Sequence, residues 1–326
     1  MRQSRRNFLY GAAAGALALH GRAWAAPGNW PDRSIQLVMG YPSGGATDGV
    51  MRPLEMILQR ELGQPVVFDY RPGAGATIAA THTARAKPDG YTLHVTDSGP
   101  MTILPNGKQL AYDPLKDFTP IGLVCEGASI IVAHPSLSVS NLGELIALAK
   151  EKPGQLHYGT SGLGGAAHLS GELFQAVTGA SLEHVPYKGG SQAAIDLVGG
   201  QIPLAFASTG TALPFVETGK MKPLAVTSRN RVAIFPDVPT VAEAGYPDYD
   251  ATVWFAIVAP PGLPRHIVDK AHAALQSALN TPEAGNALRA QGYEPAPGSP
   301  EDLQRRIQAD NEKWRALIRD KQIKFQ

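Results

Sequence analysis

The 326-residue sequence has little charge and almost no cysteine. Lys and Arg number 29 and Asp and Glu 28, which gives a formal net charge of +1, and charged residues make up only 17% of the chain. This balance excludes a whole-protein basic field of the kind that binds nucleic acid. One cysteine excludes an intramolecular disulfide framework and a cysteine-based zinc cluster. Cys125 lies in an apolar run, which favours a buried, inert thiol.

The motifs of several enzyme classes are also missing. The chain has no G-x-x-x-x-G-K-[ST] and no H-E-x-x-H, and its histidines lack metal-ligand spacing. We therefore expect no cofactor and no metal. Ser98, in Asp97-Ser98-Gly99-Pro100, carries only part of a serine-protease motif, and Gly159 to Gly162 is one residue short of G-x-S-x-G. A secreted serine hydrolase using Ser98 or Ser161 is therefore the weaker alternative to a protein without catalytic activity.

Residues 1–25 have the composition of an export signal. They hold four arginines and no acid, a weakly apolar run from Gly11 to Leu19, and Ala23-Trp24-Ala25 as a cleavage site. The pair Arg5-Arg6 followed by Phe8-Leu9 favours the twin-arginine route over an ordinary secretory signal. Removing four of the 29 basic residues leaves 25 against 28 acidic ones, a net charge of −3. No later run of about 18 apolar residues exists, so we expect a soluble, periplasmic mature chain.

Strands and helices are expected to alternate along the mature chain. Residues 34–39 read as a strand, and 47–62 as a helix with apolar residues at helical spacing. The last third reads as three helices, at 265–279, 283–291 and 301–320. The pattern predicts an α/β fold with mostly parallel sheets, and about 300 residues favour two domains. Further strands are expected at 65–68, 91–95, 117–124, 129–133, 156–158, 203–207, 224–227 and 253–259, and further helices at 79–86, 142–149, 168–177 and 193–198.

Small polar loops join several of these strands to helices. A helix N-terminus has unpaired N–H groups and partial positive charge, and glycine lets an anion approach that backbone closely. Any one such loop usually only turns the chain. Two glycine-rich loops of this kind in an exported α/β protein together predict a clamp for a small dianion across a cleft. The candidate residues are Tyr41, Pro42, Ser43, Gly44, Gly45, Ala46, Thr47 and Asp48 in the first loop, Ser98 and Gly99 in the second, Thr160, Ser161, Gly164, Gly165, Ala166 and His168 in the third, and Tyr187 in the fourth.

These segments, in this order, resemble the substrate-binding proteins of tripartite tricarboxylate transporters, the TctC or Bug-type family. The resemblance covers essentially the whole mature chain. Its segments include Tyr41 to Asp48, Arg71 to Gly75, Lys87 to Leu93, Tyr112 to Pro120, Ser161 to Phe174, His184 to Gly189 and Phe235 to Gly245. Where the family often has Asp-Asn after the strand at 203–207, this chain has Ser208 and Thr209, and Ser208 is expected to donate a hydrogen bond instead.

The resemblance implies a periplasmic two-lobe fold of the Venus flytrap type, each lobe a mostly parallel sheet flanked by helices. Lobe 1 would be residues 26–127 plus 253–326, and lobe 2 residues 128–252. The implied ligand is a di- or tricarboxylate or an aromatic carboxylate, held by the candidate residues above. The implied partners are integral-membrane transporter subunits, or a membrane sensor to which the protein presents its ligand, and the protein is expected to be a monomer.

Overall fold

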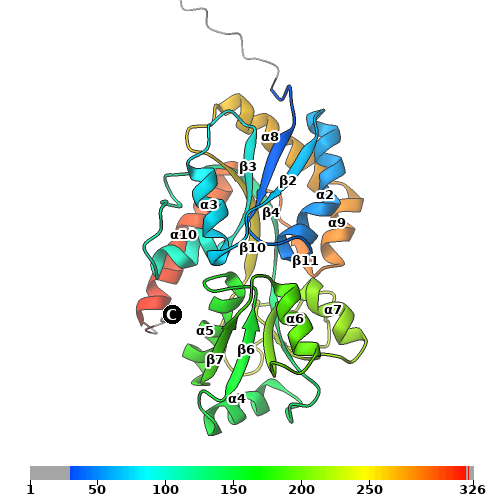
Figure 1. The fold of residues 1–326 in the computed structure, drawn as a ribbon, viewed down its shortest axis with the longest axis vertical. Helices are drawn as coiled ribbons and strands as arrows, with labels where there is room; N and C mark the ends of the chain where they lie inside the picture. Colours follow the sequence, from blue (N-terminus) through cyan, green and yellow to red (C-terminus); the bar gives the residue numbers. More distant parts are fainter. Residues whose placement is uncertain (1–29, 321, 323–326) are drawn as a thin grey trace, which may run out of the picture.

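The computed structural model describes residues 30–320 and 322, and it holds two β-sheets in the two halves of an elongated molecule (Figure 1). The predicted export signal, residues 1–25, lies outside the described residues. Among the residues that are described, no helix combines the length and the apolar character that crossing a membrane requires.

The first half is built on a six-stranded sheet with the order β11-β4-β10-β3-β1-β2. Its five longer helices pack on the two faces of this sheet (Figure 1). The strands are β1 (Ile35–Met39), β2 (Val66–Tyr70), β3 (Thr92–Asp97), β4 (Thr119–Gly127), β10 (Val253–Ala259) and β11 (Tyr293–Pro295). The helices are α2 (Ala46–Leu62), α3 (Thr77–Ala84), α8 (Arg265–Leu279), α9 (Pro282–Arg289) and α10 (Pro300–Asp320), with short turns η1 (Ala74–Ala76), η2 (Gly99–Ile103) and η3 (Leu104–Asn106).

The second half is built on a five-stranded sheet with the order β7-β6-β8-β5-β9. Buried aromatic residues such as Tyr158, Phe174 and Phe206 fill the space between this sheet and its helices. The strands are β5 (Ser129–Ala133), β6 (Leu156–Thr160), β7 (Leu182–Pro186), β8 (Leu204–Ser208) and β9 (Lys222–Val226). The helices are α4 (Leu142–Glu151), α5 (Ala166–Thr178), α6 (Gly190–Val198) and α7 (Thr209–Glu217).

The α/β prediction is confirmed, but the prediction of mostly parallel sheets was wrong. In the first sheet, β1 is parallel to β2 and β3, whereas β10 is antiparallel to β3 and β4, and β11 to β4. In the second sheet, β6 is parallel to β7 and β8, whereas β5 is antiparallel to β8 and β9. The reason is the path of the chain. It leaves the first half through β4 and returns through β10, and strands running in opposite directions pair antiparallel.

Local sequence explains where the helices begin and end. In α2, Val50, Leu54 and Leu58 are buried at helical spacing, and Gly63 ends the helix with a φ of 69°, which glycine adopts without strain. Strand β7 was not predicted because Glu183 and His184 interrupt its apolar pattern. Helix α7 was not predicted because Pro214 lies inside it.

The C-terminal helix α10 packs against both halves. Its first turns bury Leu303 and Ile307 in the first half, while Trp314 belongs to the apolar core of the second half. Near its end, Lys313 Nζ lies 3.3 Å from a carboxylate oxygen of Asp250. The lobe boundaries expected after residues 127 and 252 stay a prediction, and α10 adds a link between the halves that the predicted boundaries did not foresee.

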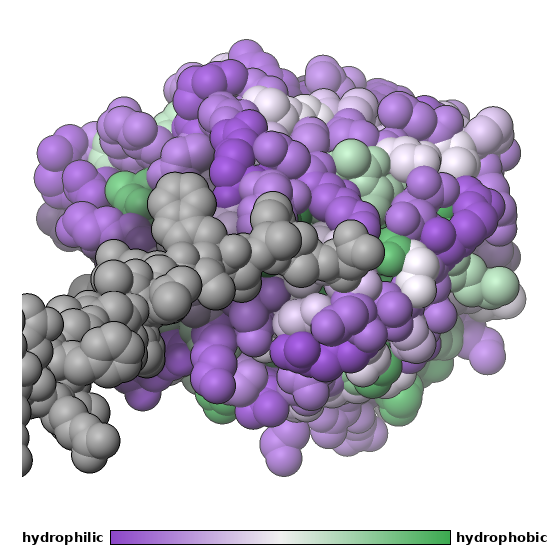
Figure 2. All heavy atoms as spheres, turned by 90° about the horizontal axis from the view of Figure 1, so that it is seen from above, coloured by the Kyte–Doolittle hydropathy of each residue, from purple (hydrophilic) through white to green (hydrophobic). Residues whose placement is uncertain are grey.

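Seen from the end of the first half, the surface is mostly hydrophilic, and its apolar residues are scattered (Figure 2). The large exposed apolar side chains of this half include Met56, Val67 and Ile78. Single apolar side chains of this kind are normal on a protein surface. They do not mark a continuous contact area on the face that this view shows.

Candidate functional site

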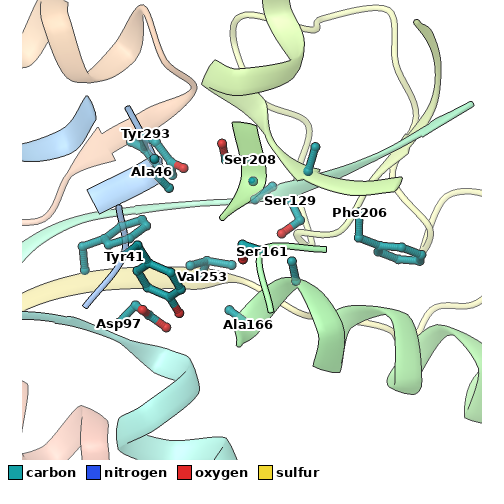
Figure 3. A pocket seen from close by; sticks show the side chains of 16 residues that line it. Tyr41, Ala46, Asp97, Ser129, Ser161, Ala166, Phe206, Ser208, Val253 and Tyr293 are labelled. Atoms are coloured by element: carbon teal, nitrogen blue, oxygen red, sulfur yellow. The ribbon is translucent and has the colours of Figure 1, made fainter. Parts of the chain in front are cut away.

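A cavity lies between the two halves, at the ends of strands from both sheets (Figure 3). Its accessible volume is about 50 Å³. One water molecule needs roughly 10–15 Å³ on the same measure, so the cavity has room for a small molecule. The first half contributes Tyr41, Gly45, Ala46, Asp97, Val253, Phe255 and Tyr293, the second half contributes Ser129, Ser161, Ala166, Ala167, Gly190, Phe206, Ala207 and Ser208, and Ala128 lies at the crossing between them.

Three helices begin at this cavity without a side-chain cap. Their N-caps are Gly45 for α2, Gly165 for α5 and Gly189 for α6, and glycine has no side chain that could accept a hydrogen bond from the first N–H groups of the helix. By contrast, Asn141 caps α4 and Ser208 caps α7 with their side chains. Uncapped N–H groups and aligned peptide dipoles favour an anion at all three starts. The cavity can therefore hold a carboxylate without a basic side chain.

The loops from the two halves touch each other beside the cavity. Ser191 Oγ donates to the carbonyl oxygen of Gly44 at 2.9 Å, and Thr209 Oγ1 donates to that of Gln291 at 2.7 Å. A methyl group added at Gly99 would lie only 3.0 Å from the backbone nitrogen of Ala166. The absence of a side chain at Gly99 therefore lets η2 and the start of α5 approach this closely.

Asp48 holds the first loop together. Its carboxylate accepts hydrogen bonds from the Gly44 N–H at 3.0 Å, from Arg52 Nε at 3.2 Å and from the Tyr70 hydroxyl. Burial raises the pKa of Asp48, but Tyr70, the Gly44 N–H and Arg52 outweigh burial and bring the pKa below its ordinary value. The Asp48 carboxylate is therefore ionised, and its oxygens already accept hydrogen bonds from within the protein.

A pair of stacked imidazoles supports the third loop. His168 Nδ1 accepts the Gly164 N–H at 3.1 Å, and His184 Nε2 lies 2.7 Å from Thr160 Oγ1, with the two ring centres 4.0 Å apart. Burial lowers the pKa of His168 to about 3 and that of His184 to about 4. Both rings are therefore neutral near pH 7, and they position the loop rather than supply charge.

Asp97 is a cavity residue that the sequence reasoning missed. Its side chain is 2% exposed and lies beside Tyr41 in Figure 3. Burial raises the pKa of Asp97 to about 6, although the Gly99 N–H and the Tyr41 hydroxyl act in the opposite direction. Oδ1 accepts the Gly99 N–H at 2.8 Å. Within residues 30–320, Oδ2 is a buried oxygen without a hydrogen-bond partner.

The predicted residues take three different places. Tyr41, Gly45, Ala46, Ser161, Ala166 and Ser208 line the cavity, and Gly44 and Asp48 line an adjoining groove. The others line neither the cavity nor this groove: Pro42, Ser43, Thr47, Ser98, Gly99, Thr160, Gly164, Gly165, His168 and Tyr187. Tyr187, for example, donates its hydroxyl to Asp196 at 2.8 Å. Which of them contact a ligand stays a prediction.

The missed residues had only weak signals in the sequence. Asp97 directly precedes the predicted Ser98, and Ser129 opens a predicted strand. Phe206, Phe255 and Tyr293 had no signal, because apolar strand residues look alike whether they face a core or a cavity. Among the described residues, no group of three or more His, Cys, Asp or Glu side chains could hold a metal ion.

Comparison with known proteins places the chain in one family. The model of the tripartite tricarboxylate transporter family receptor matches residues 50–323. Protein BugT of Bordetella pertussis is 35% identical over 296 residues, covering 89% of this chain and 90% of BugT. A solved R. palustris protein with adipate is 35% identical, with a TM-score of 0.86, covering 90% of this chain and 99% of that one. MatC from Rhodopseudomonas palustris with bound malate is 30% identical, with a TM-score of 0.85, covering 89% and 100%.

These matches confirm both the resemblance seen in the sequence and the two-lobe fold of periplasmic binding proteins. The matches to BugT and to the protein with adipate cover 89% and 90% of the chain. The chain belongs to the tripartite tricarboxylate transporter family of receptors.

Proposed function

We propose that this chain is a periplasmic binding protein that captures a small organic carboxylate between its two halves. The observation that carries the proposal is the meeting of three uncapped helix starts, those of α2, α5 and α6, at one cavity. Hydrogen bonds to a charged group contribute about 1.5–3 kcal/mol each, so several N–H donors can hold a carboxylate firmly. Two relatives with the same fold bear adipate and malate, which supports a carboxylate as the ligand.

The hydroxyls of the cavity fit binding better than catalysis. The described histidine hydrogen bonds go to backbone atoms, to Ser136 or to Thr160, and none goes to Ser98 or Ser161. A serine nucleophile needs a base within hydrogen-bond reach. The family is one of receptors, which also supports binding without chemistry.

We further propose that the protein is exported by the twin-arginine route, acts as a monomer and delivers its ligand to membrane transport subunits. The family description names a transporter, which supports delivery over presentation to a sensor. Deleting the gene should abolish uptake of the labelled ligand by whole cells, and a plasmid copy should restore it. Normal uptake without the protein, together with a lost transcriptional response to the ligand, would favour the sensor.

Thermal unfolding in the presence of organic acids tests the binding proposal. The panel contains mono-, di- and tricarboxylates, aromatic carboxylates and amino acids, all at pH 7.5. A ligand present at 100 times its Kd should stabilise the folded protein by about 2.7 kcal/mol, and calorimetry then measures Kd for each acid that shifts the melting temperature. The neutral amide of each acid serves as the control, because it lacks the charge that the helix starts attract. If no acid raises the melting temperature, the proposal is wrong.

A further inference from the structure

A further groove lies at the strands that link the two halves, on the face opposite the cavity. Its lining includes Thr252, Gly292 and Glu294, whereas Val253 and Tyr293, their neighbours in sequence, line the cavity. Successive residues of a strand point to opposite faces, so the groove and the cavity lie on opposite faces of these strands. We call it the hinge groove. It lies between the loop of residues 228–233 in the second half and the segment 289–294 in the first, and its accessible volume is about 270 Å³.

Arginines from both halves line the hinge groove. Arg229 and Arg231 belong to the second half, and Arg289 belongs to the first. With Glu126 and Glu294, the lining holds three basic and two acidic side chains, a net charge of +1. Both acids are already paired with arginines. By contrast, the part of the cavity lining that the structure describes includes no arginine or lysine.

The three guanidinium groups keep N–H donors for a ligand. Arg289 Nε donates to Glu294 at 2.9 Å, and Arg231 Nε donates to Glu243 at 2.9 Å. Arg229 donates to a backbone carbonyl oxygen at 3.3 Å, and among the described residues it has no carboxylate partner. A guanidinium carries five N–H donors, so donors remain on each of the three. The hinge groove therefore offers positive charge and hydrogen-bond donors from both halves.

We infer that the hinge groove binds a phosphate group that pairs with arginines of both halves. Guanidinium groups recognise phosphate oxygens through paired N–H donors. The oxygens of a phosphate point in several directions, so guanidiniums on two sides of a groove can pair with them at once. A group that pairs with both halves holds them together and should favour the closed arrangement, in which their loops touch beside the cavity. The phosphate can belong to a soluble molecule or to a lipid headgroup.

Calorimetry with pyrophosphate at pH 7.5 tests the inference without any organic acid, so the test holds even if the proposed function fails. Arg229→Gln and Arg289→Gln should each weaken pyrophosphate binding about fivefold or more, because each removes hydrogen bonds between charged groups. Arg229→Gln is the cleaner change, since it leaves no described carboxylate without its partner. Arg85→Gln is the matched control. It removes an exposed arginine at the end of α3, outside the groove, and should keep Kd within about twofold of the wild type.

A second measurement tests the link to the cavity. Saturating pyrophosphate should raise the affinity for the best acid of the panel about fivefold in the wild type and not in Arg229→Gln. The acid should raise the affinity for pyrophosphate by the same factor, because coupling between two sites is reciprocal. Co-sedimentation with phosphatidylglycerol vesicles separates the two sources of phosphate. Vesicle binding that Arg229→Gln abolishes assigns a lipid headgroup, and binding of pyrophosphate without vesicle binding assigns a soluble molecule.

Four outcomes would overturn the inference. If neither pyrophosphate nor vesicles bind, or if Arg229→Gln binds both as the wild type does, the hinge groove is not a phosphate site. Weaker binding in Arg229→Gln but not in Arg289→Gln would confine the anion to the second half. Pyrophosphate binding that is lost in Gly190→Pro, which removes an N–H from the cavity, and kept in Arg229→Gln would place the anion in the cavity. Unchanged acid affinity in saturating pyrophosphate would refute the effect on closure.

Discussion

Asp97 is a buried acid whose ionisation opposes folding. Burial raises its pKa from 3.8 to about 6, so the folded chain holds the proton over a pH range in which the unfolded chain has released it. Stability therefore falls as pH rises from about 3.8 to about 6, and the loss is complete above the folded pKa. A buried acid with a strongly shifted pKa in a cavity is typical of a functional site.

Replacing Asp97 by Asn should stabilise the ligand-free protein at pH 7.5 but not at pH 3.5. A pKa difference of about two units corresponds to about 3 kcal/mol at most, and we expect a gain of about 1–3 kcal/mol in the free energy of unfolding. Urea denaturation of both proteins at the two pH values measures it. An equal difference at both pH values would show that ionisation of Asp97 is not the cause.

The helix starts are the elements that should hold the ligand carboxylate. Gly190 is the first residue of α6 and lines the cavity, and its preceding residue Gly189 has φ −172° and ψ 158°. That extended conformation is compatible with a following proline, and proline is accepted at the first position of a helix. Gly190→Pro therefore removes one N–H from the cavity while α6 keeps its start.

Gly190→Pro should weaken binding of the best acid of the panel by about tenfold or more, because a hydrogen bond to a charged group contributes about 1.5–3 kcal/mol. Gly190→Ala is the matched control. A methyl there would lie 3.9 Å from Ser161 Cβ, and the N–H remains. Its Kd should stay within about threefold of the wild type. Calorimetry compares the three proteins, and equal affinities would show that the start of α6 does not contact the ligand.

The elements could be predicted from sequence far better than the site. Glycine-rich loops next to apolar runs marked the starts of α2 and α5, and both helices end at a left-handed glycine, Gly63 and Gly179. The direction in which each side chain points was harder to predict from the sequence. Ala166 and Ala167 line the cavity, whereas His168, one helical step of about 100° further on, turns back under the loop.

The antiparallel strands and the far side of the cavity could not be predicted locally. Phe255 pairs with Asp97 and Cys125 across more than a hundred residues of sequence, and Tyr293 joins them from β11. The sequence pattern of one strand does not indicate which distant strand will pair with it. The cavity lining therefore depends on tertiary pairing, while the loops depend on local composition.

At the scale of the whole molecule, the two halves must separate for a ligand to enter a cavity that both of them line. Three segments join the halves: β4 running into β5, the return into β10, and α10, whose Trp314 packs in the second half. Ligand binding can shift the equilibrium between the open state, with the halves separated, and the closed state only by the ligand's difference in affinity for the two. Changing the ratio of these states from 1:99 to 99:1 requires about 5.5 kcal/mol.

A disulfide across the cavity mouth should hold the halves together. A Cβ built at Gly189 would lie 4.0 Å from the Cβ of Pro42, within the range of about 3.5–4.5 Å found in disulfides. Gly189 has a φ of −172°, which any residue adopts, and Cys125 is fully buried and should not exchange with the new pair. Oxidised Pro42→Cys/Gly189→Cys should take up ligand on the order of 100-fold more slowly than the reduced form, because the open state is removed.

Stopped-flow measurement of ligand uptake with and without dithiothreitol tests this lock, and each single cysteine variant under the same oxidising conditions is the control. Ligand loaded before oxidation should be retained through dialysis and released on reduction, because the same barrier blocks exit. Fast exchange in the oxidised double variant would mean that ligand reaches the cavity without separation of the halves. The groove beside the cavity, between α2 and α7 and lined by Gly44, Asp48 and Ser208, would then be the route of entry to examine.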